Sequence, residues 1–159
     1  MYDDEPKIIR AEMSIDDRGV LTHCNEFQLV GVQRFYTISN HRRGFVRAWH
    51  GHRLSCTWLW PIKGIWRIAA GGTIADTLAD RDERIESGNR LKKARARVQS
   101  YFCDPTSMLF VPGGWYNGHQ NMTDDGILGV FSTATVEQVK DDDVRLWWNH
   151  WSIWEEQQR

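Results

Sequence analysis

Two histidines and an arginine lie within six residues of one short segment, Arg47-Ala48-Trp49-His50-Gly51-His52. Side chains alternate between the two faces of a β-strand, so His50 and His52 share one face and Arg47 points to the other. A bend or bulge in the strand would bring Arg47 to the same pocket. Two imidazoles in one cavity suit either a metal ion or proton transfer beside a carbonyl group. The segment therefore predicts a functional site with one of these two chemistries.

Short apolar segments separated by Gly, Asn, Asp and Pro predict the strands that position this site. They cover residues 27–39, 45–52, 56–62, 65–70, 98–102, 108–111 and 127–136. Many short strands with turn residues between them favour an all-β sandwich or barrel. Because the chain has 159 residues and 41% hydrophobic content, we expect one domain that spans residues 1–159.

Two segments interrupt this pattern of strands. Residues 73–97 alternate acidic and basic side chains around few apolar ones, which is typical of a solvated excursion or a short helix. Near the C-terminus, apolar side chains recur at spacings of three and four after three consecutive aspartates, which predicts a short capped amphipathic helix. Its apolar face comprises Val144, Trp147, Trp148, Trp151 and Trp154.

The charge balance and the cysteines exclude several classes of protein. The formal net charge of -1 provides no overall field that would favour nucleic acid or an anionic membrane, so local arginines must hold any anionic ligand. No apolar segment approaches the length of a membrane span, and the first residues lack the pattern of a signal peptide. Three cysteines without CxxC spacing indicate reduced thiols. We therefore expect a cytoplasmic protein with no nucleic-acid or membrane partner.

The glycines and histidines around the site resemble the first motif of the cupin superfamily, with Thr57 in place of its glutamate. Residues 112–121 resemble the second motif, in which Asn117 stands in place of the metal-binding histidine. This resemblance implies a double-stranded β-helix, the jelly-roll barrel of the cupins. Because two of the four ligand positions bind divalent ions poorly, we predict no metal. The alternative is a metal site formed by His50, His52 and His119.

Further blocks resemble the dTDP-4-dehydrorhamnose 3,5-epimerases, a metal-independent family of cupins. They are residues 16–21, Asn40, residues 44–50 and residues 111–114. The resemblance extends over roughly residues 16–149 and implies an enzyme without a cofactor. It would act on a dTDP-like nucleotide-diphosphate 4-keto-6-deoxy sugar and move protons at C3 or C5, beside the C4 ketone. The resemblance also implies a homodimer whose subunits exchange an N-terminal strand.

The epimerase resemblance assigns roles to individual residues. His50 matches the catalytic base, and Arg47 matches the arginine that holds the diphosphate. Arg18 and Asn40 match residues that help to hold the nucleotide sugar, and Arg18 would reach in from the neighbouring subunit. The substrate-binding residues expected in all are Arg47, Arg18, Asn40, Asn117 and Trp49.

Several positions depart from the epimerase pattern. Phe131 stands where the epimerases have a tyrosine that acts as the acid, and Thr57 stands where a lysine steadies the enolate. The late aspartate that pairs with the base has no match. We therefore expect other side chains to assist His50. The candidates are His52, His119 and Tyr116, with Tyr36 and Tyr101 as alternative acids.

The histidine pair resembles a second family, the dTDP-4-keto-6-deoxyglucose 3,4-ketoisomerases, whose motif is Arg-Gly-x-His-Ala-His. Two bases on one face suit a proton that moves from C3 to C4, which makes His52 a partner of His50. The sequence leaves three functions open. An epimerase is favoured because its blocks cover more of the chain. A 3,4-ketoisomerase and a cupin that binds a nucleotide sugar without catalysis are the alternatives.

Overall fold

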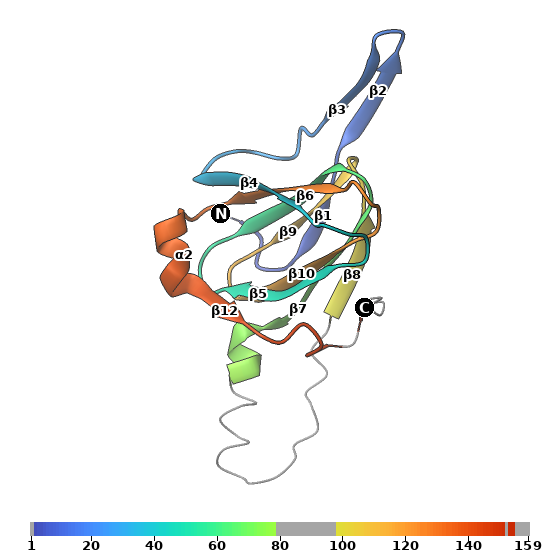
Figure 1. The fold of residues 1–159 in the computed structure, drawn as a ribbon. Coiled ribbons are helices and arrows are strands. Elements are labelled where there is room, and N and C mark those ends of the chain that lie inside the picture. The colour runs from blue at the N-terminus through green and yellow to red at the C-terminus, as the bar shows by residue number, and fades with distance from the viewer. Residues whose placement is uncertain (1, 79–97, 152, 155–159) are drawn as a thin grey trace.

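The structure is a computed structural model that describes residues 2–78, 98–151, 153 and 154. These residues form two five-stranded antiparallel sheets and a separate two-stranded hairpin (Figure 1). The first sheet contains, in spatial order, β1 (Lys7–Arg10), β9 (Ser107–Val111), β6 (Thr57–Lys63), β11 (Ile127–Ser132) and β4 (Arg34–Ser39). The second contains β12 (Asp143–Arg145), β5 (Val46–His52), β10 (Trp115–Asn121), β7 (Trp66–Thr73) and β8 (Val98–Cys103). This architecture confirms the predicted all-β cupin barrel.

The space between the two sheets holds the main hydrophobic core. Leu59 of β6, Ile68 of β7, Leu109 of β9 and Leu128 of β11 are each at most 2% exposed and belong to one cluster. They come from both sheets because alternate residues of each strand face inward. Burial of each such side chain contributes about 1.5–3 kcal/mol to folding, so this cluster holds the two sheets in fixed positions around the site.

Aromatic layers cover the outer faces of both sheets. On the first sheet, Trp58 and Phe110 pack with Phe27 from the segment that precedes β4. On the second, Trp49 and Tyr116 pack with a group of apolar side chains from the C-terminal segment. That group is Val144, Leu146, Trp151, Ile153 and Trp154. Much of the unusual tryptophan content of the chain is therefore used in layers outside the barrel.

The helix of the C-terminal region lies earlier than the sequence predicted. Helix α2 (Val136–Asp142) begins directly after Thr135, whose side chain caps it in a capping box with Gln138. Residues 143–145 form β12 instead, and residues 146–151 contain only turns and bends. The predicted helix over Val144 to Trp154 is therefore wrong. The spacing does not mark a single buried face, because Val144, Trp151 and Trp154 pack against the outer face of the second sheet whereas Trp147 is 80% exposed.

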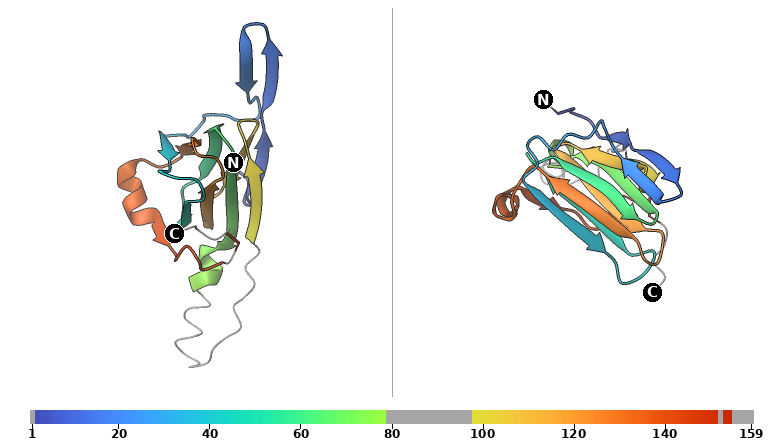
Figure 2. Two further views of the ribbon diagram at one scale, coloured as in Figure 1. Left: turned by 45° about the vertical axis from the view of Figure 1, so that its right-hand side comes forward. Right: turned by 90° about the horizontal axis from the view of Figure 1, so that it is seen from above.

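One described hairpin extends from the barrel. Hairpin β2 (Glu12–Asp16) and β3 (Gly19–His23) projects away from the sheets in Figures 1 and 2. Residues 74–78 are helical, and the remainder of the predicted excursion, residues 79–97, lies outside the described residues. Within the described part of the chain, no helix is long and apolar enough to cross a membrane.

Candidate active site

A pocket of about 570 Å³ lies between the two sheets, beside the hydrophobic core. Strands β4 and β6 provide one wall, and β5, β10 and β12 provide the other. Its charged and polar lining is concentrated in three arginines, three histidines and an acidic residue. These are Arg34, Arg47, Arg145, His50, His52, His119 and Asp143.

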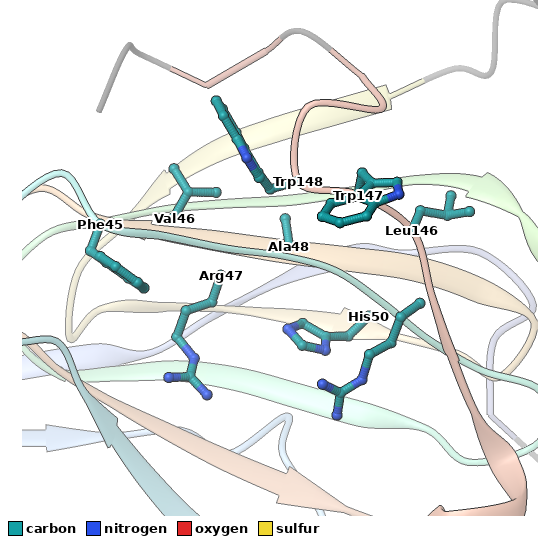
Figure 3. Close-up of a pocket in the computed structure, with 9 residues that line it drawn as sticks. Phe45, Val46, Arg47, Ala48, His50, Leu146, Trp147 and Trp148 are labelled. Carbon is teal, nitrogen blue, oxygen red and sulfur yellow. The ribbon is translucent and has the colours of Figure 1, made fainter. Parts of the chain in front are cut away.

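Arg47, His50 and His52 line this pocket together. Between β5 and β10, Asn117 pairs with His50 and His119 pairs with Arg47, so β5 has one more residue than β10 over this stretch. This β-bulge cancels the alternation that would send Arg47 to the opposite face. Figure 3 shows Arg47 and His50 on the same side of the strand. The simple alternation of side chains, which placed Arg47 opposite to His50, is therefore wrong.

Gly118 lies opposite the bulge and allows the two strands to approach closely. A Cβ atom at this position would lie 2.5 Å from the Cβ of Ala48, a distance at which the two carbons would overlap. Asn117 completes the contact on the pocket side, because its side-chain amide donates a hydrogen bond of 3.0 Å to the backbone carbonyl of His50. Asn117 therefore both lines the pocket and holds the strand that carries the base candidate.

Strand β12 brings two further charged residues to the histidines. Arg145 pairs with His50, and Asp143 pairs with His52 in the antiparallel ladder, so each faces the pocket beside its partner. Their side chains also contact each other at 2.6 Å. Sequence reasoning missed both residues, since they lie about 90 positions after the histidine motif and only strand pairing reveals them.

Burial and positive neighbours keep His50 and His119 uncharged. Burial lowers the pKa of His50 to about 4, and the nearby Arg145 adds to this effect. His119 is 3% exposed, and burial, with His50 and Arg47 close by, lowers its pKa to about 3. His119 lies on β10. Both imidazoles are therefore neutral near pH 7 and able to accept a proton.

His52 has a more acidic surrounding than His50. Its Nδ1 atom lies 3.8 Å from a carboxylate oxygen of Asp142 at the end of α2. Burial lowers the pKa of His52, but Asp142 and Asp143 oppose this effect. The resemblance to the epimerases gave no aspartate to pair with a histidine. The fold nevertheless brings two aspartates, Asp142 and Asp143, close to His52.

Strand β4 supplies a candidate acid from the opposite wall. The Tyr36 ring lies under the guanidinium of Arg34, 4.8 Å from its carbon, and both residues line the pocket. Burial raises the pKa of Tyr36, so its hydroxyl keeps its proton at neutral pH. Phe131, which stood in the place of the epimerase tyrosine, packs on the outer face against Phe27 and Phe35. Tyr36 therefore offers the phenol that Phe131 lacks.

A neighbouring hollow of about 500 Å³ shares Arg47, His50 and Arg145 with the pocket. Figure 3 shows Phe45 and Trp147 on its rim. The Trp147 side chain is 80% exposed and offers a flat apolar surface close to the arginines. The two hollows together resemble a site that could take a long ligand with an aromatic end and an anionic centre.

Several predicted site residues lie elsewhere. Trp49 is fully buried in the outer layer of the second sheet, against Trp151 and Trp154, so its predicted contact with substrate is not supported by its position. Tyr116 is 1% exposed in the same layer, which removes it from the pocket as an acid. Both point outward because they flank the inward-facing residues of β5 and β10.

Three more residues are also separate from the pocket lining. Asn40 donates a hydrogen bond to the backbone carbonyl of Phe45 and so supports the start of β5. Arg18 lies at the turn of the β2–β3 hairpin and pairs with Asp16, with its side chain 85% exposed. Tyr101 packs against the main core from β8. None of the three residues is among those that line the pocket.

The described residues contain no group of three or more His, Cys, Asp and Glu side chains that could hold a metal ion. The alternative ligand set of His50, His52 and His119 does not meet this condition.

The two strongly shifted histidines predict an acid-sensitive fold. In the unfolded chain they take up protons below about pH 6.5, whereas the folded protein resists protonation down to about pH 4 at His50 and about pH 3 at His119. The histidines therefore contribute fully to the free energy of unfolding above pH 6.5. As the pH is lowered from 6.5 to 5.5, each histidine reduces that free energy by about 1 kcal/mol. Urea unfolding at several pH values measures this slope. His119→Gln should reduce the slope, whereas His41→Gln, at an exposed position, should not.

Known proteins share this fold at low sequence identity. A 3,4-ketoisomerase from Helicobacter canadensis is 17% identical with a TM-score of 0.63, over 89% of this chain and 90% of that chain. A 3,4-ketoisomerase mutant from Thermoanaerobacterium thermosaccharolyticum, in complex with TDP-4-keto-6-deoxyglucose, is 15% identical with a TM-score of 0.62, over 91% and 90%. The dTDP-4-dehydrorhamnose 3,5-epimerase from Bacillus anthracis, with TDP and pyrophosphate bound, is 14% identical with a TM-score of 0.64, over 91% and 79%. The sequence matches no protein-family model and no curated protein. The fold is thus that of the nucleotide-sugar epimerases and ketoisomerases.

Proposed function

We propose that this protein is an isomerase that moves a proton beside the C4 ketone of a nucleotide-diphosphate 4-keto-6-deoxy sugar. The observation that carries the proposal is the pocket itself, in which two imidazoles from one strand lie among arginines from three strands. A neutral imidazole is free to accept a proton from carbon, and guanidinium groups hold phosphates. Proteins with the same fold have been solved with TDP and with TDP-4-keto-6-deoxyglucose, which supports this class of substrate.

The two hollows fit the parts of such a substrate. Arg47 and Arg145 lie between them and would hold the diphosphate through charged hydrogen bonds. The nucleobase would stack on Trp147 at the rim of the neighbouring hollow of about 500 Å³, the outer hollow. The sugar would then enter the inner pocket, where His50, His52 and Tyr36 surround it.

The common chemical step begins at a carbon next to the ketone. His50 removes the C3 proton, the C–H electron pair forms a C3=C4 double bond, and the C4 carbonyl oxygen becomes an enolate oxygen. For ketoisomerisation, that oxygen takes up a proton, the C3 hydroxyl gives up its proton, and a proton is added to C4. The product carries the ketone at C3. No oxidant or reductant is needed, since the electrons only move within the sugar.

The pocket favours 3,4-ketoisomerisation, although the sequence blocks favoured an epimerase. His50 and His52 come from the same strand and face the same pocket, which suits removal and return of protons on one side of the sugar. Epimerisation at C3 or C5 is the second candidate because Tyr36 offers an acid from the opposite wall. An acid on the opposite side would invert the carbon from which His50 takes the proton.

Incubation with TDP-4-keto-6-deoxyglucose in deuterated water distinguishes the candidates. We expect NMR to show a 3-keto product with deuterium at C4. An epimerase would leave the ketone at C4 and place deuterium at C3 or C5, and a binding protein would bind TDP without any exchange. If neither TDP binding nor exchange occurs, the proposed function is wrong.

A homodimer remains a prediction, to be checked by light scattering. The hairpin that carries Arg18 exposes Ile15, Val20 and Leu21 to solvent, each with more than 60% of its surface. Such apolar surface on a projecting arm suits contact with a second copy of the chain. Arg18 could then approach the pocket of that copy.

A further inference from the structure

Strand β12 places opposite charges against the two histidines of β5. In the antiparallel ladder, Arg145 is the direct partner of His50, and Asp143 is the direct partner of His52. Directly opposed side chains of an antiparallel pair lie close together on the same face. A segment of only three residues, Asp143–Arg145, therefore gives a cationic neighbour to one imidazole and an anionic neighbour to the other.

A second carboxylate, that of Asp142, is held in place next to His52. It is 8% exposed and accepts hydrogen bonds from the backbone N–H groups of Leu54, at 2.8 Å, and Ser55, at 3.1 Å. The Ser55 hydroxyl donates a third. The same oxygen that Ser55 contacts lies 3.8 Å from Nδ1 of His52, a buried atom that has no hydrogen-bond partner. These contacts fix a negative charge beside His52.

We propose that β12 and Asp142 make the two imidazoles unequal, so that His50 removes the proton from the sugar and His52 carries the proton that is returned to it. Asp142 is a positioning residue that keeps an N–H of His52 directed at its carboxylate and leaves Nε2 for the sugar. In the step itself, His50 takes the C3 proton and passes it to the C4 oxygen, while Nε2 of His52 takes the proton of the C3 hydroxyl and gives it to C4. Both imidazoles end the step neutral, as they began. This assignment of proton transfers rests on the proposed function.

The charged groups around the two histidines agree with this division. Those near His50 are Arg145 and Asp143 of β12, Arg47 and His52 of β5, and His119 of β10. Those near His52 are Asp142 of α2, Asp143 and Arg145 of β12, and Arg34 of β4. Positive groups predominate at His50, whereas the two largest electrostatic influences on His52 come from carboxylates. Burial disfavours the charged form of both, but Arg145 outweighs Asp143 at His50, whereas Asp142 and Asp143 together oppose the effect of burial at His52.

The test is an NMR titration of the histidine Cε1–H signals in the free protein, which needs no substrate. We expect His52 to titrate at a higher pH than His50. Asp142→Asn should lower the pKa of His52 by about one unit and leave that of His50 nearly unchanged. Asp141→Asn is the matched control, because it removes the same charge from an exposed position one residue away and should change neither titration.

A second variant covers the case in which Asp142→Asn fails to fold. Arg145 has a side chain that is 69% exposed, so Arg145→Gln should fold, and it should raise the pKa of His50 more than that of His52. The inference is overturned if His50 titrates at or above the pH of His52, or if these variants shift both histidines equally. In kinetic assays, Asp142→Asn should lower kcat with KM for the nucleotide sugar unchanged. If the wild-type protein does not bind TDP, that result counts instead against the proposed function.

Discussion

Replacement of His50 by asparagine is expected to lower kcat/KM for TDP-4-keto-6-deoxyglucose by about 10²–10⁴-fold, the usual contribution of a general base. His50 is the neutral imidazole closest in sequence to Arg47, and it lines both hollows of the site. Asparagine is polar and of similar size but cannot accept the proton. Because Arg47 and Arg145 remain, the dissociation constant for TDP should stay within about twofold of the wild-type value. Single-turnover deuterium exchange followed by NMR measures the chemical step directly.

The matched control for this variant is His41→Asn. It makes the same chemical change at an exposed position between β4 and β5 and should leave kcat/KM unchanged. If the His50→Asn variant exchanged deuterium at the wild-type rate, another group would have to remove the proton. Buried His119, whose two ring nitrogens have no hydrogen-bond partner among the described residues, would then be the next base to test.

Trp49→Ala should lower the free energy of unfolding by about 3–5 kcal/mol while leaving the TDP affinity of the folded fraction unchanged. The Trp49 ring is fully buried, with ring centroids of Trp151 and Trp154 at 4.8 and 5.1 Å. Truncation would open a cavity in the layer that attaches the C-terminal segment to β5. Urea unfolding measures this loss, and calorimetric titration with TDP measures the affinity.

Trp147→Ala provides the opposite pattern and serves as the control. The Trp147 side chain is largely exposed at the rim of the outer hollow, so its loss should change stability by less than about 0.5 kcal/mol. If the nucleobase of TDP stacks on Trp147, the Trp147→Ala variant should bind TDP about tenfold more weakly, which is in the range of base–aromatic stacking energies. Equal effects of the two variants on binding would restore Trp49 as a substrate-binding residue and contradict its assignment to the outer layer.

The barrel strands could be predicted from local patterns because each has its own signal in the sequence. Apolar segments bounded by turn residues located β5, β6 and β9 to within about a residue at each end. The same method failed at the C-terminal tryptophans, since a three- and four-residue spacing is also compatible with an irregular segment that covers a sheet. It also missed β10, where Asn117, Gly118 and His119 are polar or small and give no strand signal.

The candidate site could be predicted only in part, for a physical reason. His50, His52 and Arg47 belong to one strand, so their spacing was informative. Asp143 and Arg145 reach the histidines through the pairing of β12 with β5, and Asp142 reaches His52 from the end of α2; no local pattern encodes either contact. Tyr36 was only an alternative to Tyr116 until the sheet order placed β4 across the pocket.

The bulge in β5 separates two roles that the same six residues perform. The extra residue leaves the inward-facing pair Arg47 and His50 in place, and it adds a second consecutive side chain to the outer layer, where Ala48 and Trp49 both pack. A chain with one residue between this arginine and histidine could present the same pair from a regular strand. Changes in the length of this segment among proteins of this fold would then reveal how the C-terminal segment is attached, while the chemistry of the inner wall stays constant.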